Sequence, residues 1–331
     1  MHVMRSVIYT SALLSTAMVT VSLPAQAQTR PQTPVEFEGP IQSIVQSGDA
    51  VKLKVNGIEV LIPNGLITGG GSDGVHTPTA RLTSIADIVS TTPFAGRPGT
   101  SGFVGGTAIV VGTSGDGGVT ATDVFMEPAE NVILGAVTAN SPGDFRVEGV
   151  KVYLLAPSIT KPSYPLGITF DPRLPGLPMK NELGFAIDPS KVPLYADAAL
   201  EGYFGKDMNG EGDAFYAFSI DSVSDVEDPS PTVSILRAQC RVRSTTQVEW
   251  EIRGGVYPWA QGAVIGVYPP TAAFNGAAAY VTNFVVPQDT VDPKAGAFRY
   301  TGKPNATGGC PPSVVVKYNG APDAVANVEV R

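Results

Sequence analysis

The sequence predicts an all-β protein built from three modules, and three observations support this fold class. Gly and Pro, at 37 and 29 of 331 residues, make up about one residue in five, a density that interrupts long helices. A hydrophobic pattern recurs after about 92 residues. The last hundred residues alternate apolar and polar side chains. Only 16% of residues are charged, against about 25% in average globular proteins, which disfavours a helical bundle or coiled coil.

The first 27 residues are predicted to be a signal peptide. Arg5 precedes an apolar stretch, and Ala25-Gln26-Ala27 supplies an Ala-x-Ala cleavage site. Ser and Thr interrupt the stretch, and no later segment approaches the 20 or so apolar residues that a span requires. We therefore expect an exported mature chain with no membrane span, destined for the periplasm or the medium. An uncleaved N-terminal anchor is the alternative.

The charge balance disfavours a nucleic-acid partner. Removing residues 1–27 would leave 21 Lys and Arg against 30 Asp and Glu, a formal charge of −9. Nucleic-acid binding depends on neutralising phosphates, and the sequence has no dense Lys/Arg stripe that would do so.

The first two modules are predicted to be copies of one small barrel, residues 28–129 and 130–224. Phe37–Ile44 resembles Ile133–Ala139, and each is followed by a Gly/Asp turn. Val55–Val60 and Val147–Val152 then share the pattern apolar-x-Gly-apolar-x-apolar. Each copy closes with a further hairpin. Three strands, a short helix and two strands is the element order of an OB-like barrel, so we predict a tandem duplication of this fold. Chance similarity between hairpins is the alternative.

The connecting segments of the two copies differ. In the first, an apolar stripe from Leu82 to Val89 predicts a short helix, with Thr79 as its cap. In the second, a Pro-rich insertion spans Lys161 to Pro178, and the only helix candidate is Val192–Leu200.

Residues 225–231 are acidic and Pro-interrupted and are predicted to be a linker to a third module, residues 232–331. Strict alternation in Val248–Arg253 indicates a strand with one buried face, and the module as a whole predicts an immunoglobulin-like sandwich. Cys240 and Cys310 are predicted to form a disulfide, because export would expose them to an oxidising compartment. A redox role is disfavoured because the chain has no Cys-x-x-Cys pair. Gly308 stands where a tyrosine corner would place Tyr, so the match to an antibody-type domain is incomplete.

On these patterns, the paired barrels resemble a bacterial family of exported small β-barrels of unknown function. The tail from Ile235 to Arg253, followed by Gly254-Gly255, is similar to the sandwich modules appended to bacterial surface proteins. The resemblance covers nearly the whole mature chain. It implies a fold and an extracytoplasmic location, and it carries no catalytic residue.

Two motifs bear on chemistry. Gly70–Gly74 matches G-x-S-x-G. A nucleophile elbow needs a strand before its Ser and a His far away in the sequence, whereas His76 lies beside Ser72, so a loop is favoured.

Asp207, Asn209 and Glu211 form a candidate calcium loop. The twelfth position holds Phe218 instead of Glu and no helix flanks the loop, so an ordinary hairpin turn is favoured. No cofactor is predicted.

The candidate ligand-binding residues are aromatic. Tyr257 and Trp259, with Tyr268 after the next strand, form a candidate stacking surface for sugar or peptide. The alternative is that these rings cover the sandwich core. Three barrel loops, Ser47–Asp49, Thr113–Gly118 and Lys206–Gly212, would carry recognition in an OB-like fold.

The functional hypothesis from the sequence is an exported, non-enzymatic binding or scaffolding protein of the periplasm or cell surface, with an unknown protein or a carbohydrate as ligand. Two alternatives stay open. One is a hydrolase or lyase that acts on an extracellular polysaccharide, and the other is a structural subunit of a surface assembly.

Overall fold

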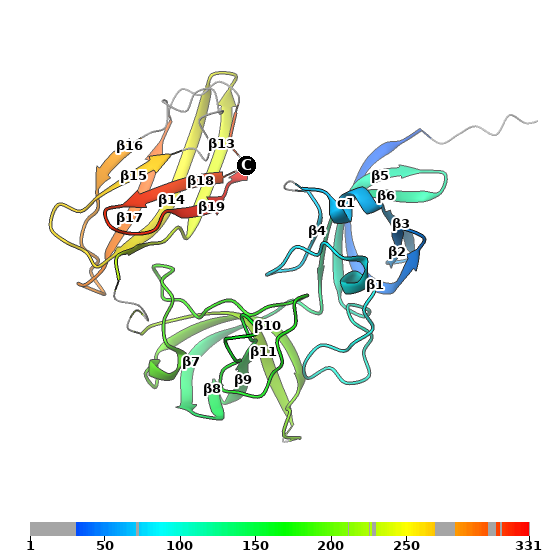
Figure 1. The fold of residues 1–331 in the computed structure, drawn as a ribbon, viewed down its shortest axis with the longest axis horizontal. Helices are drawn as coiled ribbons and strands as arrows, with labels where there is room; N and C mark the ends of the chain where they lie inside the picture. Colours follow the sequence, from blue (N-terminus) through cyan, green and yellow to red (C-terminus); the bar gives the residue numbers. More distant parts are fainter. Residues whose placement is uncertain are drawn as a thin grey trace, which may run out of the picture.

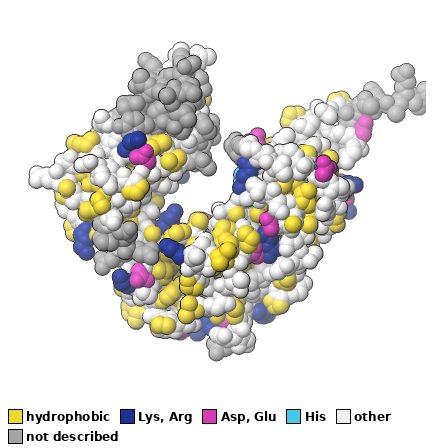
Figure 2. All heavy atoms as spheres, in the orientation of Figure 1, with side chains coloured by type: hydrophobic (Ala, Val, Ile, Leu, Met, Phe, Trp, Pro, Cys, Tyr) yellow, Lys and Arg dark blue, Asp and Glu magenta, His cyan; other side chains and the backbone are white. Residues whose placement is uncertain are grey.

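The computed structural model describes residues 31–70, 73–210, 212–224, 226, 230–268, 282–303, 309–311 and 313–330. The fold is all-β, as predicted, with two closed barrels and a two-sheet sandwich that follow one another in an arc (Figure 1). The longest described helix has five residues, so none of the described helices could cross a bilayer. On the face shown in Figure 2, charges of both signs are dispersed and no basic patch forms.

Barrel 1 closes five strands in the order β3-β2-β1-β5-β6, with β3 and β6 pairing in parallel. The long strand β1 serves two partners: its first half pairs with β5 and its second half pairs with β2. A bulge between Ile41 and Ser43 lies where the partner changes, and the extra residue there lets the strand bend around the barrel. The elements are β1 (Thr33–Ser47), β2 (Ala50–Val55), β3 (Ile58–Ile62), α1 (Asn64–Thr68), β4 (Val75–His76), α2 (Ile85–Ile88), β5 (Thr107–Gly115) and β6 (Gly118–Glu127).

Barrel 2 repeats this topology, with β7 in the place of β1 and β9 pairing in parallel with β11. Its first strand is also bulged, between Val137 and Ala139. The closing hairpins share a second bulge, before Gly112 in barrel 1 and before Gly202 in barrel 2. The elements are β7 (Asn131–Ser141), β8 (Asp144–Val147), β9 (Val150–Leu154), η1 (Pro189–Lys191), β10 (Asp197–Lys206) and β11 (Asp213–Ser222).

The turn of the second hairpin explains the repeated glycine of the sequence pattern. Two residues join β2 to β3, Asn56 and Gly57, and both have positive φ; Glu148 and Gly149 do the same between β8 and β9. This conformation follows the right-handed twist of the strands, and Gly adopts it without steric cost.

The helix predictions are confirmed in part. The stripe from Leu82 to Val89 does contain a helix, α2, but it is one turn long and its N-cap is Ser84, so the assignment of Thr79 as cap was wrong. The helix predicted over Val192–Leu200 was also wrong. A 3-10 turn, η1, precedes this range, and β10 begins within it at Asp197. The segment is a strand because Leu200 pairs with β7 on one side and β11 on the other and is fully buried there.

The sandwich packs two sheets around one core. Strands β12, β14, β13 and β20, with β17 on the other edge of β14, form one sheet, and β16-β15-β18-β19 form the second. Trp250 and Ile252 of β14 meet Ile265 of β15 and Val316 of β18 in the core. The elements are β12 (Thr232–Val233), β13 (Arg237–Ser244), β14 (Gln247–Tyr257), β15 (Val264–Tyr268), β16 (Thr282–Val285), β17 (Gly296–Gly302), β18 (Ser313–Tyr318), β19 (Ala324–Asn327) and β20 (Glu329–Val330).

The predicted disulfide is confirmed. Cys240 on β13 is bonded to Cys310, 70 residues further along the chain, and Cys240 is buried opposite Trp250 of β14. The bridge therefore joins the first strand of the central hairpin to the segment that leads into β18, which is in the other sheet.

The three bodies are in contact. One continuous hydrophobic cluster includes the core of barrel 1 and Tyr153, Tyr203 and Tyr216 of barrel 2. A smaller cluster joins Leu183 and Phe185, in the segment before β10, to Ala295 of the sandwich. Of the predicted linker, residues 225 and 227–229 lie outside the described part of the chain, and Val226 packs against this smaller cluster.

Candidate functional site

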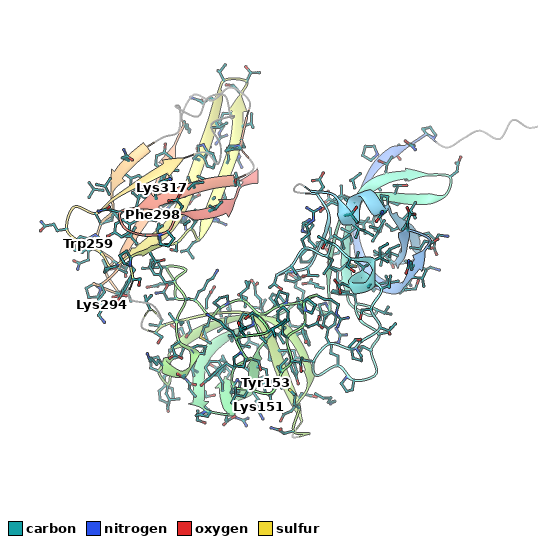
Figure 3. The ribbon with its side chains drawn as sticks, in the orientation of Figure 1. Lys151, Tyr153, Trp259, Lys294, Phe298 and Lys317 are labelled. Atoms are coloured by element: carbon teal, nitrogen blue, oxygen red, sulfur yellow. A yellow bond between two sulfur atoms is a disulfide. The ribbon has the colours of Figure 1, made fainter. Side chains whose placement is uncertain are left out.

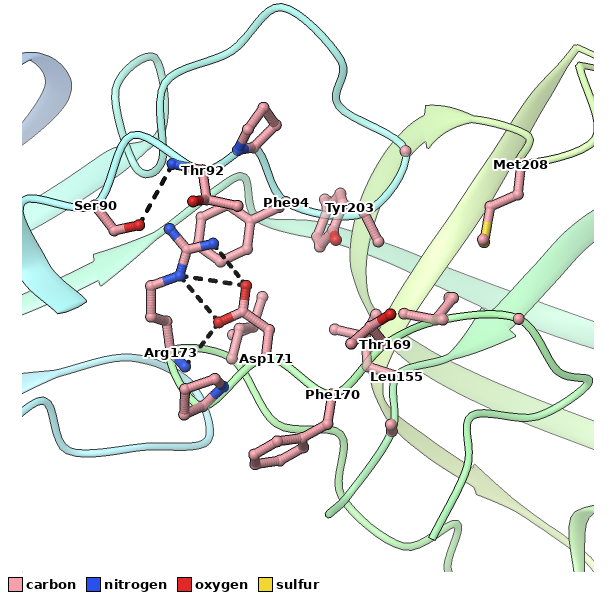
Figure 4. Close-up of a pocket in the computed structure, with 18 of the residues that line it drawn as sticks. Ser90, Thr92, Phe94, Leu155, Thr169, Phe170, Asp171, Arg173, Tyr203 and Met208 are labelled. Carbon is pink, nitrogen blue, oxygen red and sulfur yellow. Dashed lines mark hydrogen bonds and ion pairs between the residues drawn. The ribbon is translucent and has the colours of Figure 1, made fainter. Parts of the chain in front are cut away.

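A pocket of about 500 Å³ lies between the two barrels, a volume typical of small-molecule sites (Figure 4). One wall comes from residues 87–96, which contain the end of α2 and the segment that follows it in barrel 1. The opposite wall comes from residues 167–174 of the Pro-rich insertion, together with Leu155, Tyr203 and Met208 of barrel 2. The site thus exists only because two modules are packed together.

The insertion is held against barrel 1 by its apolar side chains. Ile168 and Leu174 are buried in the cluster shared by the two barrels. Gly176 approaches the backbone of Leu155 so closely that a Cβ would lie 1.8 Å from the Leu155 carbonyl oxygen. A segment without regular hydrogen bonding is therefore fixed by burial and close packing.

An ion pair dominates the polar part of the pocket. Arg173 Nε donates to Asp171 Oδ1 at 2.9 Å and Nη2 donates to Oδ2 at 2.6 Å, a bidentate arrangement. The guanidinium also lies over the ring of Phe94, with its carbon 4.3 Å from the ring centroid. The Arg173 side chain is 4% exposed and that of Asp171 is 28% exposed, so the carboxylate is the member that reaches the pocket opening.

Tyr203 ends a column of tyrosines that runs from barrel 2 to the pocket. Its ring stacks on Tyr216 at 5.4 Å, and Tyr216 stacks on Tyr153 at 5.3 Å. Burial, with a smaller contribution from Tyr216, raises the pKa of Tyr203 far above its ordinary value. The hydroxyl is therefore held protonated and able to donate.

Two buried donors at this pocket have no hydrogen-bonding partner among the described residues: Arg173 Nη1 and Tyr203 Oη. Their residues line the pocket, with Phe94 between them in contact with both. Leaving a buried donor unsatisfied costs about 1–3 kcal/mol, and more for a charged group. Native folds rarely retain such groups, so two of them beside one cavity mark this region as the candidate site.

Asp207 of the candidate calcium loop has side-chain partners within barrel 2. Tyr153 Oη donates to Asp207 Oδ1 at 2.6 Å and Lys151 Nζ donates to Oδ2 at 3.2 Å, and all three side chains are buried; Figure 3 labels Lys151 and Tyr153. Burial alone would raise the pKa of Asp207, but these hydrogen bonds outweigh it and hold the pKa below its usual value. Asn209 donates its backbone N–H to Asp207 in the turn, at 3.4 Å, and Glu211 lies outside the described residues. No three acidic, His or Cys side chains within the described ranges are placed to hold a metal ion.

Two of the three aromatic candidates, Trp259 and Tyr257, pack against different hydrophobic clusters. Trp259 packs at the edge of the sandwich core and donates from Nε1 to the Val286 carbonyl oxygen at 2.9 Å (Figure 3). The Tyr257 ring contacts Phe185, with 6.1 Å between ring centroids, in the cluster that joins the sandwich to barrel 2. The side chain of Tyr268 lies outside the described part.

The remaining sequence candidates lie away from the pocket, with one exception. Met208, from the recognition loop predicted at Lys206–Gly212, lines it, whereas the loops at Ser47–Asp49 and Thr113–Gly118 do not. Ser72 of the G-x-S-x-G match is outside the described residues. His76 Nε2 is 3.6 Å from Asp123 Oδ1, on the β4–β6 pair of barrel 1.

A buried carboxyl group at the end of barrel 1 was not singled out from the sequence. Glu127 closes β6 and is 6% exposed. Burial, followed by the negative charges of Glu130, Glu38 and Glu201, raises its pKa from 4.5 to about 7. Glu201 belongs to barrel 2, so carboxylates from both barrels influence this group.

The sequence pointed to only part of the pocket. The Pro-rich insertion was conspicuous, but nothing in its pattern showed that Arg173 would lie over the ring of Phe94, 79 positions earlier in the chain. Comparison with known proteins adds no assignment: no protein-family model matches the chain, and no curated protein matches it. Functional inference therefore depends on the geometry of the pocket.

Proposed function

We propose that this chain is an exported, non-enzymatic binding protein whose ligand occupies the pocket between the two barrels. The observation that carries the proposal is the pair of buried, unpartnered donors, Arg173 Nη1 and Tyr203 Oη, in the wall of a cavity of about 500 Å³. Export is supported by the Ala-x-Ala motif at residues 25–27 and by the disulfide, which persists in oxidising compartments. In this proposal the C-terminal sandwich is an immunoglobulin-like module that positions the barrels at the cell surface or in the periplasm.

The geometry favours binding over hydrolysis for a specific reason. Asp171, the carboxylate nearest the opening, is held by both Arg173 Nε and Nη2 and also accepts the backbone N–H of Arg173 at 3.0 Å. A general base must reach the proton that it abstracts, and both carboxylate oxygens of Asp171 already accept hydrogen bonds from Arg173. Asp171 is thus suited to orienting a ligand.

The proposal is tested with the exported protein, purified in its oxidised form. Native mass spectrometry would detect a retained small molecule, and thermal-shift screening of a metabolite library would detect binders. Thr169→Trp places a large ring at the exposed pocket margin and should abolish any stabilisation by these compounds. Thr160→Trp, at an exposed position immediately before the same insertion that does not line the pocket, is the matched control and should bind normally. Binding unaffected by Thr169→Trp would place the site elsewhere, and turnover of a compound would overturn the non-enzymatic assignment.

A further inference from the structure

The charges around the pocket restrict what it can hold. Among its described lining residues only Asp87, Asp171 and Arg173 are charged. Arg173 is neutralised by Asp171, so the lining carries a net charge of about −1 from Asp87. The one cation of the pocket, Arg173, is already paired with Asp171. A carboxylate or phosphate ligand would be repelled by the two carboxylates of the lining, Asp87 and Asp171. The lining therefore opposes an anion.

The hydrogen-bonding groups of the pocket suit a ligand that both donates and accepts hydrogen bonds. Asp171 is part-exposed and can accept further hydrogen bonds, and the buried donors Arg173 Nη1 and Tyr203 Oη belong to residues that line the pocket. Exposed hydroxyls of Thr92 and Thr169, from opposite barrels, can do either. Adjacent hydroxyls on one ring provide both donors and acceptors. A purely apolar ligand would cover Asp171 and the two Thr hydroxyls without offering them hydrogen bonds.

The rest of the wall is apolar. The apolar side chains of Leu155, Ile168, Leu174 and Met208 line the same pocket, and Figure 4 labels Leu155 and Met208. A ligand that presents both C–H groups and hydroxyls, as a pyranose ring does, matches this mixed lining. We infer that the pocket binds an uncharged saccharide unit, with one hydroxyl donating to Asp171 and others forming hydrogen bonds with the exposed hydroxyls of Thr92 and Thr169. This inference rests on the proposed function and names its ligand class.

The test compares sugars that differ in one ring substituent and thereby in charge. An array of neutral hexoses, with their uronic acid and amino sugar counterparts, is probed with the purified chain, and the best neutral sugar is then measured by titration calorimetry. We expect the uronic acid counterpart to bind at least tenfold more weakly. Asp171→Asn should weaken the neutral sugar at least tenfold, because a carboxylate accepts a hydroxyl more strongly than an amide does.

A matched variant separates the pocket from general effects of charge. Arg146 and Asp144 form an exposed Arg–Asp pair with the same sequence spacing, 2.7 Å apart, on barrel 2 outside the pocket. Arg173→Gln should abolish binding, and Arg146→Gln should leave it unchanged. Thermal melts of both variants establish that they are folded; if Arg173→Gln is not, Asp171→Asn decides.

The outcomes distinguish the ligand class from the function. Preferential binding of uronic acids, or of apolar compounds that Thr169→Trp blocks, would overturn the saccharide inference and leave the binding proposal standing. Failure of every sugar and every metabolite, with nothing retained on purification, would overturn both.

Discussion

Reduction of the Cys240–Cys310 bridge should destabilise the sandwich and leave the barrels unchanged. The bridge closes a 70-residue loop, and in the chain-entropy model such a loop is worth about 4 kcal/mol, within the range of about 2–5 kcal/mol found for small secreted domains. Reduction keeps both sulfur atoms in the core beside Trp250, so the change acts mainly through the unfolded chain and creates no large cavity. The barrels contain no Cys.

The positions of the two tryptophans allow the sandwich to be followed by itself. Trp250 and Trp259 are the only Trp residues of the chain, and both pack in the sandwich core. Tryptophan fluorescence therefore reports this module, and far-UV circular dichroism reports all three. With a loss of about 4 kcal/mol and a urea m-value of about 1–3 kcal/mol/M, the fluorescence midpoint should fall by about 1–4 M on reduction.

The barrels should contribute a second transition that does not move. They share one hydrophobic cluster with each other, whereas the sandwich meets them through the small cluster around Leu183, Phe185 and Ala295. A variant with Ser at both Cys positions provides the control, because reductant should not affect it. An unmoved fluorescence midpoint after release of two thiols would refute the loop-entropy reasoning. Coincident fluorescence and dichroism transitions, shifting together, would show that the sandwich and barrels unfold as one unit.

Three further predictions concern the barrels. The pKa of Glu127 rises from 4.5 in the unfolded chain to about 7 in the fold. Between these two values the folded protein keeps a proton that the unfolded chain releases. The stability that this proton contributes is therefore lost as the pH rises from about 4.5 to about 7. Glu127→Gln should therefore raise the unfolding free energy at pH 8 by about 1–2 kcal/mol, with little effect at pH 4, measured by urea titration. Tyr203→Phe removes an unpartnered buried hydroxyl and should stabilise the protein by up to about 1–3 kcal/mol while weakening ligand binding. Tyr216→Phe is the comparison: it loses a hydrogen bond to the Lys206 carbonyl and should destabilise the protein by about 1 kcal/mol. Gly112→Ala and Gly202→Ala lie at equivalent bulges. A Cβ would come within 2.4 Å of a partner-strand carbonyl oxygen at Gly112 and within 2.2 Å at Gly202, so each variant should lower the melting temperature by several degrees. An unchanged melting temperature for either would show that its bulge relaxes.

The sequence by itself determined the all-β class, the barrel hairpins and the disulfide. Local rules govern these features: alternation marks a strand with one buried face, and the Gly in Asn56-Gly57 and Glu148-Gly149 marks a two-residue turn. Where local and tertiary preferences compete, the sequence was misleading. Val192–Leu200 has a helical pattern, yet Leu200 lies in a strand because ladder pairing on both sides and complete burial outweigh a weak helix propensity.

Only the tertiary structure determined the pocket. Its walls come from segments nearly 80 residues apart, and what makes Arg173 notable is not its residue type but its burial over Phe94 and its bond to Asp171. Neither barrel contains the pocket alone. Packing between modules depends on the complementarity of two whole surfaces, and no periodicity or motif within one segment encodes that.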